Sequence, residues 1–119
     1  MIEEQAAQAF AKEWVDAWNA HDIERVLSHY TDDFVMETPM ALKFAPETNG
    51  IVKGKDAIRA YWTTALERVP DLFFELHEVL TGINGITLYY TNPAIGRKTA
   101  EILFLNEAGK VYRAYAFYN

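Results

Sequence analysis

Along Thr99–Asn119, apolar and polar residues alternate with a period of two on both sides of the turn Asn106–Gly109. Side chains along a strand point to opposite faces in turn, so this stretch predicts two long antiparallel strands joined by a hairpin. In the first of these strands, Glu101 shares its face with Leu103 and Leu105. The pattern therefore places a carboxyl group on an otherwise apolar face.

Two environments are compatible with this position of Glu101. If the carboxyl group is buried in an apolar pocket, loss of hydration disfavours the charged form and raises its pKa. If it lies at the pocket rim, it can pair with Arg97, Lys98 or Arg113, and an ion pair lowers the pKa. Glu101 is a candidate acid–base group in the first case and a structural residue in the second.

Three stretches of the first 70 residues have the period of a helix. The first helix is predicted from Glu3 to Ala20, and the second is short and begins after an N-cap at Asp22. The third follows Gly54 and runs through Arg68. Their apolar faces are rich in aromatic residues: Phe10, Trp14 and Trp18 in the first, Tyr30 at the end of the second, and Tyr61 and Trp62 in the third.

The remaining segments predict strands and one long connection. Strands are expected at Phe34–Pro39, Leu72–Leu80 and Ile86–Thr91, and Thr31–Asp33 is expected as a polar turn. Met40–Lys53 is predicted to be irregular, and loops of this length often form lids or mouths of binding sites. Within the second of these strands, strict alternation groups Leu72, Phe74, Leu76 and Leu80 opposite Phe73, Glu75, His77 and Val79.

The order of these elements predicts an α+β fold, in which the helices cover one face of a curved antiparallel sheet. The 119 residues are expected to form a single domain, 1–119. The strands carry apolar residues on both faces, and three helices can cover only one of them. A second apolar face usually marks an interface, so a homodimer through the outer sheet face is predicted.

Composition narrows the function. The chain has no cysteine and its single serine, Ser28, lies in a helical pattern, so thiol and serine nucleophiles are not expected. The three histidines lack metal-ligand spacing, so no metal and no cofactor are predicted. A net charge of −6 disfavours nucleic-acid binding. No apolar run suits a membrane span and no basic leader precedes an apolar stretch, so a cytoplasmic protein that binds a neutral or weakly charged hydrophobic small molecule is expected.

Several short motifs make the sequence similar to a known superfamily. They are Trp18–Asp22 (WNAHD), His29–Phe34 (HYTDDF), Gly54–Ile58 (GKDAI) and Asn106–Val111 (NEAGKV). The chain resembles the nuclear transport factor 2-like superfamily, in its SnoaL-like and ketosteroid-isomerase-like branch. This resemblance implies a cone-shaped curved sheet closed by the helices around a pocket. The fold hosts isomerases, cyclases, dehydratases and binding domains, so it does not define one activity.

The resemblance also assigns roles to individual positions. The general-base aspartate of the isomerase falls at Thr38, which cannot act as that base. Its two oxyanion-hole residues fall at Trp14 and Glu101, and a pocket tryptophan falls at Tyr118. Polyketide cyclases of the SnoaL-like group carry their acid–base residue on a later strand, a position that Glu101 satisfies.

These observations leave two hypotheses. In the first, the protein is a cofactor-free isomerase or cyclase acting on a hydrophobic cyclic carbonyl compound. Glu101 is then catalytic, and the substrate contacts Trp14, Trp18, Tyr30, Thr38, Tyr61, Trp62 and Tyr118, with Tyr90 and Tyr112 as further hydroxyl donors. In the second, the domain is a non-catalytic ligand-binding or structural dimer whose aromatic residues fill the cone. A pocket of ~300 Å³ or more would favour the first.

Overall fold

A computed structural model describes all residues from Met1 to Asn119. Its helices are α1 (Glu4–Asn19), α2 (Ile23–Leu27), α3 (Pro39–Phe44) and α4 (Lys55–Arg68), with one 3₁₀ turn, η1 (Pro46–Thr48). Its strands are β1 (Tyr30–Glu37), β2 (Ile51–Lys53), β3 (Glu75–Thr81), β4 (Gly85–Asn92), β5 (Arg97–Leu105) and β6 (Val111–Tyr118).

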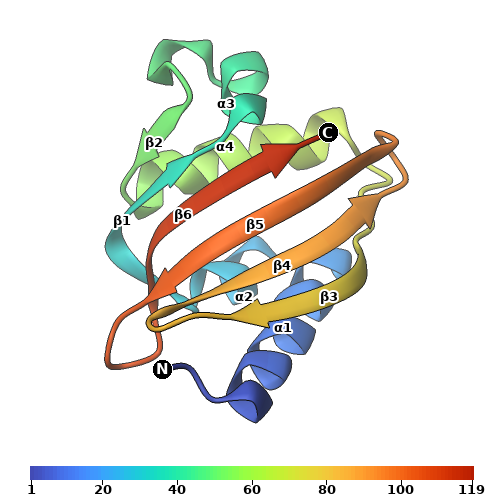
Figure 1. Ribbon diagram of the computed structural model, residues 1–119. Coiled ribbons are helices and arrows are strands. Elements are labelled where there is room, and N and C mark those ends of the chain that lie inside the picture. Colours follow the sequence, from blue (N-terminus) through green and yellow to red (C-terminus); the bar gives the residue numbers. More distant parts are fainter.

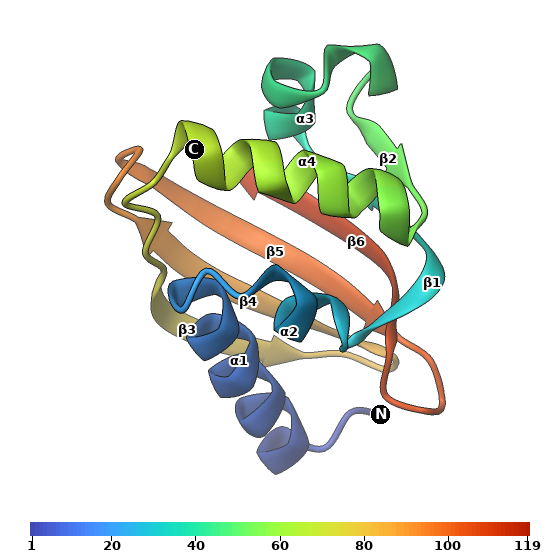
Figure 2. The same cartoon turned by 180° about the vertical axis from the view of Figure 1, so that it is seen from behind.

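The six strands form one curved sheet in the order β2-β1-β6-β5-β4-β3. The helices lie on a single face of this sheet, behind it in Figure 1 and in front of it in Figure 2. The predicted α+β fold is therefore confirmed. One detail was wrong: the sheet is not wholly antiparallel, because β1 pairs with β6 in the parallel direction.

The long helices form where the apolar period predicts them. α1 buries Ala7, Ala11, Trp14, Ala17 and Trp18, all on the stripe that faces the sheet. α2 begins as predicted, since the side chain of Asp22 accepts a hydrogen bond from the backbone N–H of Arg25. No helix combines the length and the apolar character that crossing a bilayer requires.

The position of α1 on the sheet also depends on the residues at and just after its C-terminal end. The side-chain amide of Asn19 donates to the carbonyl of Phe74 at 3.1 Å and accepts from its N–H at 2.7 Å. The ring of His21 lies 2.8 Å from the carbonyl of Leu72. These contacts occupy the backbone of residues 72–74, so β3 begins at Glu75 and not at Leu72 as predicted.

The segment predicted to be irregular, Met40–Lys53, contains α3, η1 and the short edge strand β2. Thr38 caps α3 by accepting a hydrogen bond from the N–H of Met40 at 3.2 Å. Pro39 suits the first helical position because its missing N–H would have no partner there. The expectation of an irregular loop was wrong, since a six-residue helix with one apolar turn leaves little periodicity to detect.

Strict alternation fails in two strands that contain bulges. The register of β3 shifts between Leu76 and Glu78, so Val79 packs on the core and Leu80 is exposed, the reverse of the prediction. An extra residue in one strand moves every later side chain to the other face. The predicted turn at Thr31–Asp33 was also wrong, because these residues lie in β1 where its pairing with β6 is irregular.

The outer face of β3–β6 has no helix over it (Figure 1). It exposes large apolar side chains, including Phe117 at 57% and Leu80 at 55%. Arg113 and Tyr115 lie on the same face of β6 as Phe117, and the guanidinium of Arg113 donates to the hydroxyl of Tyr115 at 3.2 Å. The homodimer through this face stays a prediction.

Phe117→Lys is expected to convert a dimer into a monomer, because burying an unpaired charge in an apolar interface is costly. Light scattering coupled to size exclusion measures the change in mass. Gln8→Lys, which adds the same charge on the exposed side of α1 and away from the outer sheet face, is the control and should leave the mass unchanged. A wild-type protein that is monomeric at high concentration would contradict the prediction.

Candidate functional site

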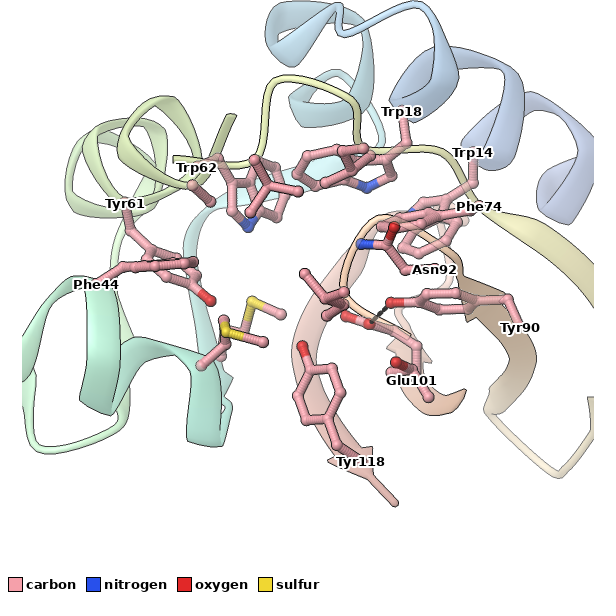
Figure 3. A pocket seen from close by; sticks show the side chains of 17 residues that line it. Trp14, Trp18, Phe44, Tyr61, Trp62, Phe74, Tyr90, Asn92, Glu101 and Tyr118 are labelled. Carbon is pink, nitrogen blue, oxygen red and sulfur yellow. Dashed lines mark hydrogen bonds between the residues drawn. The ribbon is translucent and has the colours of Figure 1, made fainter. Parts of the chain in front are cut away.

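A cavity of about 70 Å³ lies between the inner face of the sheet and the helices (Figure 3). Of its 17 lining residues, 14 are hydrophobic. The 17 residues come from α1, α3 and α4, from strands β1, β4, β5 and β6, from the segment before β3, and from the loop between β4 and β5. All three tryptophans of the chain, Trp14, Trp18 and Trp62, contribute to its wall. A cavity of this size holds a few water molecules or one small group of a ligand.

Glu101 is the only ionisable carboxyl group in this wall. The register of the sheet places it between Leu88 and Ala116 on the inner face, and its exposed fraction is 4%. The hydroxyl of Tyr90 donates a hydrogen bond to its Oε1 at 2.9 Å. Burial raises the pKa of Glu101 to about 7, against a smaller opposing effect of this hydrogen bond.

No cation pairs with Glu101, since none of the ion pairs of the chain includes it. Arg97, Lys98 and Arg113, the partners considered from the sequence, are exposed and lie away from the cavity interior. The geometry therefore corresponds to the buried carboxyl and not to the ion pair. A carboxyl group with a pKa near neutrality can take up and release protons at physiological pH.

Tyrosine hydroxyls surround this carboxyl group. Tyr118 and Tyr61 line the cavity, and Figure 3 shows their hydroxyls directed towards its centre. Burial raises the pKa of Tyr118 to about 12, and the charge of Glu101 acts in the same direction. Burial likewise raises the pKa values of Tyr61 and Tyr90. All three hydroxyls thus stay protonated and able to donate hydrogen bonds.

Two further polar groups in the cavity wall are buried without any hydrogen-bond partner. They are the indole N–H of Trp18 and the hydroxyl of Thr99. Buried polar groups are nearly always paired, so an orphaned donor needs an explanation. A ligand atom in the cavity would supply the missing partner for each of them.

Three of the residues predicted to contact a substrate have other roles. The indole N–H of Trp14 donates to the hydroxyl of Tyr30 at 2.9 Å, so only its ring faces the cavity and it cannot serve an oxyanion. Tyr30 is buried outside the cavity, where it packs on Phe34 and Trp62. Thr38 is buried as the cap of α3 and does not line the cavity.

The other predicted positions, Trp18, Tyr61, Trp62, Tyr118 and Glu101, do line the cavity. Tyr112 does not, because the bulge in β6 turns it to the exposed outer face. Two polar wall residues, Thr99 and Asn92, were not predicted. Thr99 could have been found, since it shares the strand face of Glu101 and lies two residues from it. Asn92 likewise shares a strand face with Tyr90, but the predicted strand ended at Thr91, whereas β4 extends to Asn92.

A larger vestibule of about 550 Å³ adjoins the cavity. The two spaces share five wall residues: Met40, Phe44, Val69, Ile95 and Tyr118. α3 supplies Met40 and Phe44, so part of the segment predicted to form a mouth does so. Together, the vestibule and the cavity can hold a molecule that the cavity alone cannot.

No three His, Asp or Glu side chains converge in a way that could hold a metal ion. The cavity wall instead offers aromatic faces, with Trp18 and Trp62 in edge contact at 4.9 Å between ring centroids and Phe74 and Tyr90 at 4.2 Å. Aromatic groups in such a wall suit a flat apolar ligand.

Residues 11–116 match the family model described as a SnoaL-like domain. No curated protein is similar enough to the chain to count as a relative. Among solved structures, a SnoaL-like protein of unknown function from Burkholderia thailandensis is 41% identical in sequence and has a TM-score of 0.93. The match covers 99% of this chain and 98% of the Burkholderia chain.

Two more distant structures show the same fold. A nuclear transport factor 2-like protein of unknown function from Cytophaga hutchinsonii has a TM-score of 0.68 at 14% identity, over 100% of this chain and 92% of its own. TerC, co-crystallised with polyporic acid, has a TM-score of 0.76 at 13% identity, over 95% of this chain and 92% of the TerC chain. At these identities the likeness concerns the fold alone.

Proposed function

The chain belongs to the SnoaL-like domain family, and on that premise we propose that it moves a proton on a hydrophobic cyclic carbonyl compound, as isomerases and cyclases do, with Glu101 as the acid–base group and no cofactor. The observation that carries this proposal is the unpaired carboxyl group buried in an aromatic cavity. Its pKa of about 7 suits both halves of a proton transfer.

The proposed step begins with Glu101 ionised. The carboxylate removes a proton from the carbon next to the carbonyl group, and the electron pair of the broken C–H bond forms the C=C bond of an enolate. The negative charge moves to the carbonyl oxygen. Glu101, now protonated, returns the proton to a carbon atom of the enolate, so that the enzyme ends in its starting state.

The enolate oxygen needs hydrogen-bond donors that are already in place. The hydroxyl of Tyr118 and the unpartnered N–H of Trp18 face the cavity and can supply them. Thr99 lies on the same face of β5 as Glu101 and lines the same cavity, so its hydroxyl is a third candidate donor. These donors take the place of Trp14, whose N–H is already used by Tyr30.

The sizes of the two spaces support a particular placement of the substrate. The reacting carbonyl end occupies the 70 Å³ cavity, and the remaining part of the molecule lies in the vestibule. The co-crystal of TerC with polyporic acid supports a small organic ligand on this fold. α3 then covers the substrate with Met40 and Phe44.

Wild-type protein is expected to accelerate exchange of the α-protons of 2-tetralone in D₂O, followed by proton NMR. The rate should rise with pH and level off above pH 7, because the base is the ionised form of Glu101 and its pKa is about 7. An exchange rate that equals that of buffer at every pH, while 2-tetralone binds, would contradict the proposal.

A second function is favoured by the small volume of the cavity. A non-catalytic ligand-binding or structural domain would also fill its cone with aromatic side chains. It would also need no carboxylate at position 38, where this chain has a threonine that caps α3. In that case the two orphaned groups, Trp18 N–H and Thr99 hydroxyl, would bind water or a stable ligand. Binding of 2-tetralone without proton exchange is the result that this alternative predicts.

A further inference from the structure

The vestibule differs in charge from the rest of the molecule. It is lined by three cationic side chains, Lys43, Arg68 and Arg97, and by one acid, Asp71, in a chain whose net charge is −6. Lys43 and Arg68 take part in none of the ion pairs of the chain. The positive charge at this mouth is therefore available to a ligand.

The other contacts of Lys43 and Arg68 leave their charge uncompensated. Lys43 and Arg68 lie over the ring of Phe44, at 5.9 Å and 5.7 Å from its centroid. Arg97 differs from them, because its Nη1 donates to a main-chain oxygen of Asn119, the last residue, at 2.7 Å. Phe44 lines both spaces, so the cations stand where the vestibule meets the apolar cavity.

The interior of the cavity has the opposite preference. Its wall holds no cation, and its one ionisable carboxyl group, Glu101, would repel a second negative charge. An anionic group therefore binds favourably in the vestibule and unfavourably in the cavity. This difference fixes the direction in which a ligand with one charged end can enter.

We propose that the vestibule binds the carboxylate of an amphipathic acid whose aromatic or alicyclic part occupies the cavity. The substrate class is then a cyclic carbonyl compound that carries an acidic side chain. This inference rests on the proposed function, since it concerns the same cavity. It also replaces the expectation of a neutral or weakly charged ligand, which followed from the net charge of the whole chain.

Quenching of tryptophan fluorescence tests the inference directly, because all three tryptophans line the cavity. The probes are 5-phenylpentanoate and its uncharged amide, 5-phenylpentanamide, at pH 8 and low ionic strength. The acid is expected to bind about tenfold more tightly than the amide. The difference should shrink at 1 M salt, where the Debye length falls to about 3 Å.

Lys43→Met should weaken binding of the acid about two- to fivefold and leave binding of the amide unchanged. Lys53→Met is the matched control, since it removes the same charge from an exposed lysine of β2 that does not line the vestibule. Equal effects of the two variants would overturn the inference, because the acid would then respond only to net charge.

An absent carboxylate site and an absent aromatic cavity give different results. If wild-type protein binds the amide as tightly as the acid, the carboxylate site is wrong and the proposed aromatic cavity stands. If neither probe quenches the fluorescence, the cavity does not accept aryl ligands, and both the inference and the proposed function are overturned.

Discussion

Glu101→Gln is expected to slow proton exchange on 2-tetralone by roughly 10²- to 10⁴-fold, which is the usual contribution of a general acid–base group. Glutamine has the shape of glutamate, and its Oε1 can still accept the hydrogen bond from Tyr90. It cannot take up the substrate proton. The affinity for 2-tetralone, measured by tryptophan quenching, should therefore change much less than the exchange rate.

Glu107→Gln provides the matched control for this substitution. Glu107 lies in the exposed turn between β5 and β6, so the variant has the same change in net charge without a change in the cavity. Its exchange rate should equal that of the wild type. If Glu101→Gln retained the wild-type rate, another group would have to carry the proton, and the assignment of Glu101 would be wrong.

The stability of the fold is expected to fall by about 3 kcal/mol as the pH rises from 4.5 to 7, through the titration of Glu101 alone. Below pH 4.5 the carboxyl group is protonated in both the folded and the unfolded chain. Between pH 4.5 and 7 the unfolded chain loses the proton while burial keeps it on folded Glu101, whose pKa is raised to about 7. Above pH 7 both states are ionised and the loss is complete.

Urea unfolding of the wild type and of Glu101→Gln, measured from pH 4 to pH 9, isolates this effect. Other carboxyl groups titrate in both proteins; for example, the pKa of half-buried Glu13 is lowered to about 2 by its contacts with Arg25 and His29. Subtracting the two curves removes these shared contributions. A difference in unfolding free energy that does not vary with pH would show that Glu101 is not a buried carboxyl with a raised pKa.

The parts of the fold that the sequence could predict are those with a regular apolar period. α1 and α4 follow from their aromatic stripes, and the β5–β6 hairpin follows from alternation on both sides of a polar turn. The same alternation placed Glu101 on the inner face, because β5 contains no bulge before Leu105. In these elements, local pattern and tertiary packing demand the same arrangement.

The parts that could not be predicted depend on contacts between distant segments. The bulge in β3 reverses Val79 and Leu80, and nothing in the local pattern marks it. Trp14 was expected to donate into the cavity, but the hydroxyl of Tyr30 lies within its reach only after α1 has packed on β1. The basic vestibule likewise gathers Lys43, Arg68 and Arg97 from three separate elements.

The parallel pairing of β1 with β6 has a consequence for how this domain can assemble. Tyr30 is paired with Val111, and Met36 with Ala114, so the centre of the sheet joins segments from the two ends of the sequence. Contacts of such long sequence separation slow folding, because the loop between them must close before any of them is gained. Until β6 is in place, the aromatic faces of α1 and α4 lack part of the wall they pack against. A chain whose sheet closes late in this way exposes aromatic side chains longer during folding, which favours aggregation at that stage.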